Sequence, residues 1–136
     1  MQRLGLQRLK TNNPARFDTP FTMSVDLISA VCGGVSASER AATVHALVSE
    51  STQPNDLGRP GHVFPLVAHA GGLKERRGHT EAGVALMQLS GLYPAAVICE
   101  LMNEDGSMMR GEALRAFTQQ HNIPLCSIDD IEAAVA

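Results

Sequence analysis

Aromatic and paired cysteine side chains are scarce in this sequence. It has no tryptophan and one tyrosine, and its three cysteines, Cys32, Cys99 and Cys126, include no Cys-x-x-Cys pair. The shortage of aromatic rings gives little support to stacking on bases or sugars. The absent Cys-x-x-Cys pair argues against a structural zinc site. An odd number of distant cysteines is typical of reduced thiols, so we expect a cytoplasmic compartment.

A strong charge and a long apolar run are also missing. The net charge is −3, and no basic stretch stands out, which argues against nucleic acid as a partner. No apolar run approaches the ~20 residues that a membrane span needs. The first residues lack the apolar segment of a secretory signal. We therefore expect a protein that contacts neither nucleic acid nor a membrane.

The composition itself is that of an ordinary folded domain. The 136 residues are 44% apolar and 18% charged, and we expect residues 1–136 to form a single domain. Patterns of strand and helix alternate along the chain. This predicts an α/β or α+β fold with a mixed sheet flanked by helices.

The expected elements follow from apolar periodicity and turn residues. Strands are predicted at 21–26, 63–68, 95–102 and 125–128, and helices at 37–50, 80–91, 112–120 and from 129 onwards. Turns are predicted at 11–14 and 103–106, and the second of these should return antiparallel. The 95–102 run is the most apolar and should be a central strand.

Residues 76–81 are the first candidate for chemistry. Gly78, His79 and Thr80 stand at the predicted start of a helix, where free backbone N–H groups bind anions. Arg76 and Arg77 precede them. This pattern predicts a phosphate site, with His79 free to bind a metal ion. The alternative is an ordinary helix start with solvated arginines.

His62 and Glu100 are candidates for acid–base work. His62 follows Pro60 and Gly61 and opens a predicted strand, so it is placed to transfer protons or to be a structural histidine. Glu100 ends the predicted central strand, where open sheets bind ligands. Apolar neighbours there would raise a carboxyl pKa. Its alternative is a strand-end charge that faces water.

These residues lie within motifs that resemble a known enzyme family. The motifs are the segments 21–26 (FTMSVD), 35–40 (VSASER), 59–66 (RPGHVFPL), 71–72 (GG), 76–82 (RRGHTEA) and 97–108 (VICELMNEDGSM). Together they resemble 3,4-dihydroxy-2-butanone 4-phosphate synthase, an enzyme of riboflavin biosynthesis. The resemblance runs from about residue 4 to the end.

The resemblance implies a lyase that converts D-ribulose 5-phosphate to 3,4-dihydroxy-2-butanone 4-phosphate and formate with Mg²⁺ or Mn²⁺. It implies a homodimer, a dihydroxybutanone-phosphate-synthase-like fold, and His62 and Glu100 as catalytic residues. It implies that Arg76, Arg77, Gly78, His79 and Thr80 bind the substrate phosphate and that His79 ligates the metal.

The sequence also departs from the family. Family members carry an acidic N-terminal loop that supplies a glutamate ligand to the metal, and no such loop occurs here. We therefore expect an N-terminally shortened, partial domain with an exposed sheet edge. Another carboxylate, such as Asp26, Glu104 or Asp105, would have to complete the metal site.

Two further positions lack polar side chains that family members commonly have. Cys32, Gly33 and Gly34 stand where the family has Thr-Thr-Gly, and Val67 stands where it has arginine. The alternative to catalysis is a non-catalytic shortened paralogue or fragment that binds a sugar phosphate or a partner subunit.

Overall fold

The computed structural model describes residues 2–9, 19–30 and 32–135. The predicted turn at 11–14 lies outside these residues. The chain divides into two compact units, Met1–Ala70 and Gly71–Ala136. Helices and strands are both present, as predicted. No helix in the described ranges is both long and apolar enough to cross a lipid bilayer.

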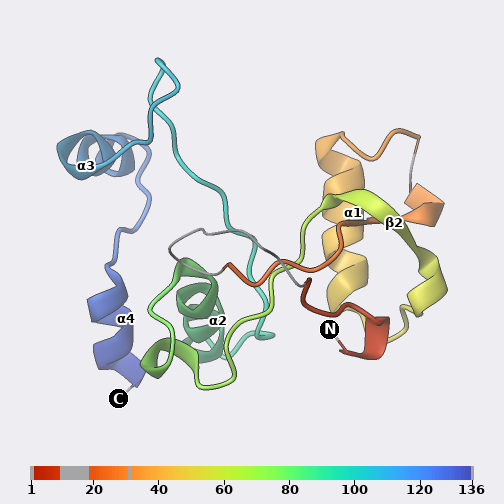
Figure 1. Ribbon diagram of the computed structural model, residues 1–136. Helices are drawn as coiled ribbons and strands as arrows, with labels where there is room; N and C mark the ends of the chain where they lie inside the picture. The colour runs from red at the N-terminus through yellow and green to blue at the C-terminus, as the bar shows by residue number, and fades with distance from the viewer. Residues whose placement is uncertain (1, 10–18, 31, 136) are drawn as a thin grey trace. The chain divides into compact units, whose positions relative to one another are not determined.

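The first unit is a small sheet covered by one helix. Strand β1 (Val25–Leu27) pairs antiparallel with β2 (Leu57–Val63), and helix α1 (Ala37–Val48) contacts both strands (Figure 1). Short 3-10 turns occupy Gln2–Leu4, Ile28–Ala30 and Pro54–Asp56. Buried apolar side chains form the core of this unit: Leu4, Leu6, Val25 and Leu57, with Leu47 packed against them.

The pairing of β1 with β2 contains an irregularity that shapes the site. Val25 pairs with Val63, but the next residue, Asp26, pairs with Gly58, so residues 59–62 bulge out of the ladder. Gly61 donates its backbone N–H to the carbonyl of Ser24 at 3.1 Å. A Cβ at Gly61 would lie 2.1 Å from the backbone carbon of Val25, so only glycine fits there.

The strand predicted at 63–68 is therefore placed too late, because β2 ends at Val63. Its remainder, like the start of the predicted 21–26 strand, makes only isolated bridges such as Phe21 with Leu66. Pro65 contributes to this break because it has no N–H for a ladder.

Helix α1 begins as predicted. The hydroxyl of Ser36 accepts the N–H of Glu39, and the Glu39 carboxylate accepts the N–H of Ser36, which is a capping box. The helix ends at Val48, two residues before the predicted end.

The second unit is mostly helical. Helix α2 (His79–Leu89) packs on α4 (Ile128–Val135), and α3 (Gly111–Gln120) lies between them in sequence. Apolar side chains join α2 and α4 to the 3-10 turn Gly72–Lys74: Leu73, Ala82, Ala85 and Ile131 are buried, with Leu86 and Ile128 against them. All three helices occur close to their predicted positions.

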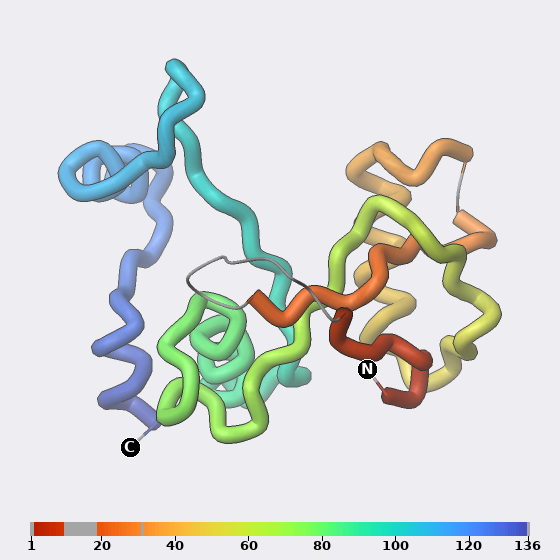
Figure 2. The backbone as a smooth tube through the Cα atoms, viewed as in Figure 1, coloured from red at the N-terminus to blue at the C-terminus, as the bar shows by residue number. Residues whose placement is uncertain are grey.

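The strands predicted for the second unit are wrong. Residues 94–101 run extended without joining a sheet, as the cyan tube shows (Figure 2). Within the described residues the strands form one two-stranded antiparallel sheet, smaller than the predicted mixed sheet. A strand needs a partner for its backbone groups, and among the described residues segment 94–101 has only one such cross-strand bond, from the N–H of Met109 to the carbonyl of Leu101 at 2.9 Å.

Two neighbouring predictions in this unit have opposite outcomes. The antiparallel return after residues 103–106 is confirmed by the bridge between Met102 and Met108. The strand predicted at 125–128 is absent, and Ile128 already belongs to α4.

Candidate functional site

His62 lies at the bulge of β2, against the carboxylate of Asp26. The backbone N–H of His62 donates to one oxygen of Asp26 at 2.9 Å, and the other oxygen lies 2.7 Å from Nδ1 of the ring. The Asp26 residue is 8% exposed, whereas the His62 side chain is 46% exposed. The buried carboxylate of Asp26 thus contacts an imidazole that is itself accessible to solvent.

The pKa of Asp26 reflects two opposing effects. Burial raises the pKa of this carboxyl, but the hydrogen bonds from His62 and the attraction of its ring outweigh burial and bring the pKa below its ordinary value. The nearby negative charge of Glu39 acts in the same direction as burial. The Asp26 carboxylate therefore accepts the backbone N–H of His62 with one oxygen and lies within hydrogen-bond distance of ring atom Nδ1 with the other.

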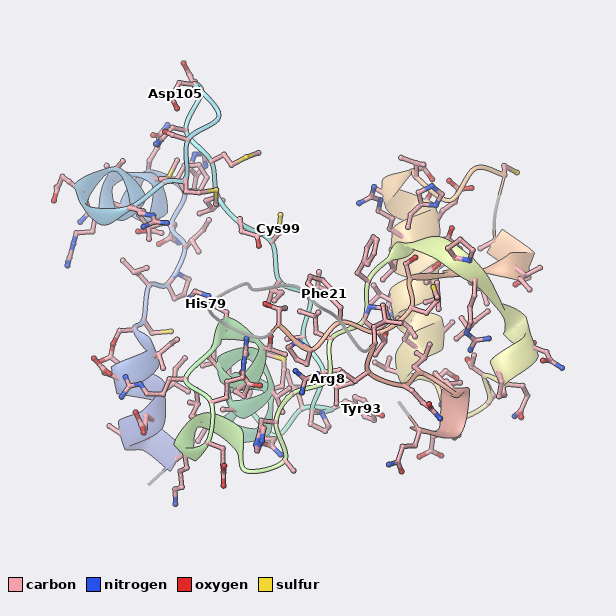
Figure 3. All side chains as sticks on the ribbon, in the orientation of Figure 1. Arg8, Phe21, His79, Tyr93, Cys99 and Asp105 are labelled. Carbon is pink, nitrogen blue, oxygen red and sulfur yellow. The ribbon has the colours of Figure 1, made fainter. Side chains whose placement is uncertain are left out.

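The N-terminus of α2, in the second unit, is a separate candidate. The helix begins at His79 after Gly78, and no side chain caps it. His79 is exposed at this end of the helix (Figure 3). An uncapped first turn leaves backbone N–H groups available to an anion.

Arg76 is held at this helix start by a buried carboxylate. Its guanidinium pairs with Glu81, whose side chain is 0% exposed. A Cβ at Gly78 would lie 2.2 Å from Nη1 of Arg76, so the guanidinium lies directly over Gly78. A guanidinium has five N–H donors in a planar fork, a geometry that suits carboxylate and phosphate oxygens.

Arg77 has a different environment. It forms ion pairs with Asp129 and Glu132 of α4, the second at 2.9 Å. The hydrogen bond to Asp129 raises the pKa of the Arg77 guanidinium. These contacts join the start of α2 to α4. The prediction that Arg77 binds phosphate stays a prediction.

A cavity of about 290 Å³ lies beside His79. Its lining is mainly apolar and comes from α2, α4 and the residues before α4: Ala82, Gly83, Leu86, Ile98, Cys126, Ser127, Ile128 and Ile131. The imidazole of His79 thus stands between an apolar hollow and the polar helix start.

Glu100 lies in the extended segment 94–101 and is exposed. Figure 3 places its neighbour Cys99 on this segment and Asp105 at the tip of the following hairpin. Within the described residues, nothing in the second unit fixes the Glu100 side chain beside His79.

The described residues do not complete a metal centre. Among residues 2–9, 19–30 and 32–135, no three His, Cys, Asp or Glu side chains are grouped to hold an ion. Asp26 is engaged by His62, and Asp105 accepts two hydrogen bonds from Ser107, which lower the pKa of its carboxyl. His79 therefore stands as a single candidate ligand.

Sequence reasoning missed the two carboxylates behind the site. Asp26 entered it only as a possible metal ligand, and Glu81 only as an acidic residue of a helix start. Both are buried against a basic side chain. The sequence offered one signal for Glu81: it is a carboxylate that closely follows the basic residues Arg76, Arg77 and His79 at a predicted helix start.

Comparisons with known proteins agree on one family. The family model described as 3,4-dihydroxy-2-butanone 4-phosphate synthase matches residues 1–134. Proteins of that name from Chlorobium limicola and Chromobacterium violaceum are 52% and 45% identical to the chain, each over 130 residues. Each match covers 96% of this chain, but 59% and 62% of the relatives. The chain thus spans about three fifths of the length of these curated relatives.

Solved structures of that enzyme superpose on the chain. A crystal structure in complex with two magnesium ions has a TM-score of 0.85 at 36% identity, covering 98% of this chain and 68% of that one. The enzyme from Candida albicans has a TM-score of 0.87 at 38% identity, covering 99% and 66%. These similarities confirm the predicted fold class.

Proposed function

The chain belongs to the 3,4-dihydroxy-2-butanone 4-phosphate synthase family, and from this premise we propose that it is a lyase acting on D-ribulose 5-phosphate. The products would be 3,4-dihydroxy-2-butanone 4-phosphate and formate, in riboflavin biosynthesis. The observation that carries the proposal is the family match over residues 1–134, which includes every predicted site residue. Because the chain spans about three fifths of its relatives, their whole activity is a proposal for it.

The substrate phosphate would bind at the start of α2. The support is the uncapped helix start at Gly78, with the guanidinium of Arg76 held over it by Glu81. Phosphate oxygens accept hydrogen bonds from such N–H groups and from arginine. His79 and Thr80, in the first turn, would complete the contacts, with Arg77 beside them.

His62 and Glu100 would transfer protons. Enolisation of the ketone removes a proton from a neighbouring carbon, and the later dehydration returns protons to oxygen. An imidazole and a carboxylate are suited to these steps. Both side chains lie in exposed positions, which supports access to a substrate.

A divalent cation, Mg²⁺ or Mn²⁺, would take part, with His79 as one ligand. The support is the family member solved with two magnesium ions. Mg²⁺ prefers several oxygen ligands, and the described residues offer no such group around His79. The other ligands would come from residues outside the described ranges or from a second chain.

A second copy of this chain is the proposed partner. Large apolar side chains in and next to the extended segment 94–101 are exposed, among them Leu92, Tyr93, Val97, Ile98 and Met102. An unpaired extended segment with such side chains favours association with another chain. Homodimer formation would bury this surface.

A reducing compartment such as the cytoplasm fits the cysteines. Cys32, Cys99 and Cys126 are free and exposed. Free exposed thiols persist where the environment is reducing.

The variant Glu100→Gln tests the catalytic assignment. We expect ribulose 5-phosphate turnover to be lost while the affinity measured by calorimetry stays within a few-fold of wild type, because Glu100 lies outside the phosphate contacts. Unchanged turnover would remove Glu100 from the mechanism. Absence of saturable binding to the wild-type chain, with Mg²⁺ present, would remove the phosphate site.

A further inference from the structure

Asp26 and His62 form a pair that the proposed function does not by itself require. Asp26 uses both carboxylate oxygens on one residue: one accepts the backbone N–H of His62 at 2.9 Å, and the other lies 2.7 Å from ring atom Nδ1. The two bonds together fix both the position and the rotation of the imidazole. A single bond to the backbone would fix only the position.

Two glycines leave room for the pair of Asp26 and His62. Gly34, with φ at +77°, lies against the pair, and a Cβ there would come within 2.5 Å of both the Asp26 carboxylate and Nδ1 of His62. Gly61 lets β2 approach β1 closely, since a Cβ there would lie 2.4 Å from the backbone nitrogen of Asp26. Two glycines are therefore needed for the ring to reach the carboxylate.

The negative charge of Asp26 determines which ring nitrogen of His62 carries the proton. The pKa of Asp26 lies below its ordinary value, so the carboxylate is an acceptor only. Glu39 of α1 is the other charged group near it, and its carboxylate is engaged by the N–H groups of Cys32 and Gly33 and by Ser36. An anionic acceptor at Nδ1 requires the proton on that nitrogen.

We propose that Asp26 is a positioning residue that holds His62 with its proton on Nδ1 and leaves Nε2 as the nitrogen that accepts a proton from substrate. Only the transfer of a proton from substrate to Nε2 rests on the proposed function. The orientation of the ring is a property of the chain itself. Asp26 acts through His62 and does not touch the substrate.

The variant Asp26→Asn reverses the hydrogen bond at the ring. The amide oxygen of asparagine must still accept the backbone N–H of His62, which turns the amide NH₂ toward Nδ1. Nδ1 then becomes an acceptor, and the proton moves to Nε2. A side chain of the same size thus produces the opposite tautomer.

Long-range ¹H–¹⁵N spectra of the neutral histidine ring measure this directly. We expect the Nδ1–H form of His62 in the wild-type chain and the Nε2–H form in Asp26→Asn. The matched control is Asp56→Asn, because Asp56 accepts a backbone N–H from Gln53 at 2.7 Å and is hydrogen-bonded to no ring. The control should leave the tautomer of His62 unchanged.

An Nε2–H ring in the wild-type chain overturns the proposal, and this holds even where Asp26→Asn fails to fold. An Nδ1–H ring in both chains also overturns it. In an active preparation we expect kcat of Asp26→Asn to fall at least about a hundredfold with little change in KM. An unchanged kcat overturns the catalytic part. A wild-type chain without turnover contradicts the proposed function, while the tautomer still decides the role of Asp26.

Discussion

Two buried carboxylates, Asp26 and Glu81, hold basic side chains of the proposed site. Asp26 contacts His62 in the first unit, and Glu81 pairs with Arg76 in the second. A buried charge is stable only with a partner, so each carboxylate restricts the side chain that it contacts. Two of the proposed site residues, His62 and Arg76, are thus each positioned by a buried carboxylate.

The pair of Arg76 with Glu81 predicts a large effect on stability. Arg76→Met removes the cation and leaves the fully buried Glu81 carboxylate without it. We expect the free energy of unfolding to fall by about 3–5 kcal/mol. Urea denaturation followed by circular dichroism measures this loss. Replacing Glu81 with glutamine in the same chain should recover part of it.

Arg77→Met is the matched control for this experiment. Arg77 also forms ion pairs, but its side chain is 55% exposed and that of its partner Asp129 is 78% exposed. Solvent screens such pairs, so the midpoint of unfolding should change little. If both variants lost the same free energy of unfolding, the buried pair would not contribute more than the exposed one, contrary to this prediction.

The residue types in the sequence identified the candidate site residues, but not the buried carboxylates that contact them. His62, Arg76 and His79 were identifiable because a histidine or arginine beside glycines at a helix or strand start indicates binding. Asp26 and Glu81 were not identifiable as supports because their burial depends on segments distant in sequence. Only the folded chain shows that Asp26 faces His62, 36 residues away.

At the scale of elements, α1 owes its start to Ser36 and Glu39. The hydroxyl of Ser36 and the N–H groups of Cys32, Gly33 and Ser36 donate to the Glu39 carboxylate. Such hydrogen bonds, that of Ser36 first, bring the pKa of Glu39 far below its ordinary value of 4.5. The same carboxylate orders the glycine turn beside the Asp26–His62 pair. The cap therefore supports both the helix and the site.

This lowered pKa predicts how stability changes with pH. A carboxyl with a depressed folded-state pKa stabilises the fold fully above its unfolded value, near 4.5, and the contribution is lost as pH falls through the folded pKa. The variant Glu39→Gln should thus be less stable than wild type at pH 7. The difference should shrink as the pH falls below about 4.5.

Urea midpoints of both chains across this range measure the effect. Ser36→Ala should lower stability by about 1 kcal/mol at neutral pH through the same cap. A gap between wild type and Glu39→Gln that stays constant from neutral to acid pH would show that the carboxylate charge does not stabilise the turn.

Helices were located more accurately from sequence than strands, of which the predicted 21–26 only partly overlaps β1 (Val25–Leu27), for a physical reason. The helical hydrogen bonds of α1, α2 and α3 and the Ser36 cap of α1 are local, so Ser36 and the apolar spacing located these helices. Strands need a partner from elsewhere in the chain. The apolar run 95–102 has the composition of a strand, yet within the described residues only its end pairs, through the bridge of Met102 with Met108 and the bond from Met109 to Leu101.

At the scale of the whole molecule, the exposed apolar run predicts self-association. Val97 is 73% exposed in the extended segment. We expect the wild-type chain to form dimers in a concentration-dependent manner, and Val97→Lys to shift it toward monomer, because a buried lysine would be unpaired at the contact. Sedimentation velocity measures this.

Ile28→Lys is the matched control for Val97→Lys. Ile28 is 57% exposed in the first unit and lies outside the extended segment. Equal dimerisation of the wild-type and Val97→Lys chains would place the contact elsewhere. Each of the two units has its own cluster of buried side chains. That residues 1–136 fold as a single domain stays a prediction.

The central claim is that this chain performs the lyase reaction of its family. Its most direct test is the release of formate from D-ribulose 5-phosphate by the purified 136-residue chain, with Mg²⁺ and again after chelation of the metal. We predict formate in the presence of Mg²⁺ and none after chelation. A folded chain that releases no formate with Mg²⁺ would contradict the claim and favour a non-catalytic sugar-phosphate binder.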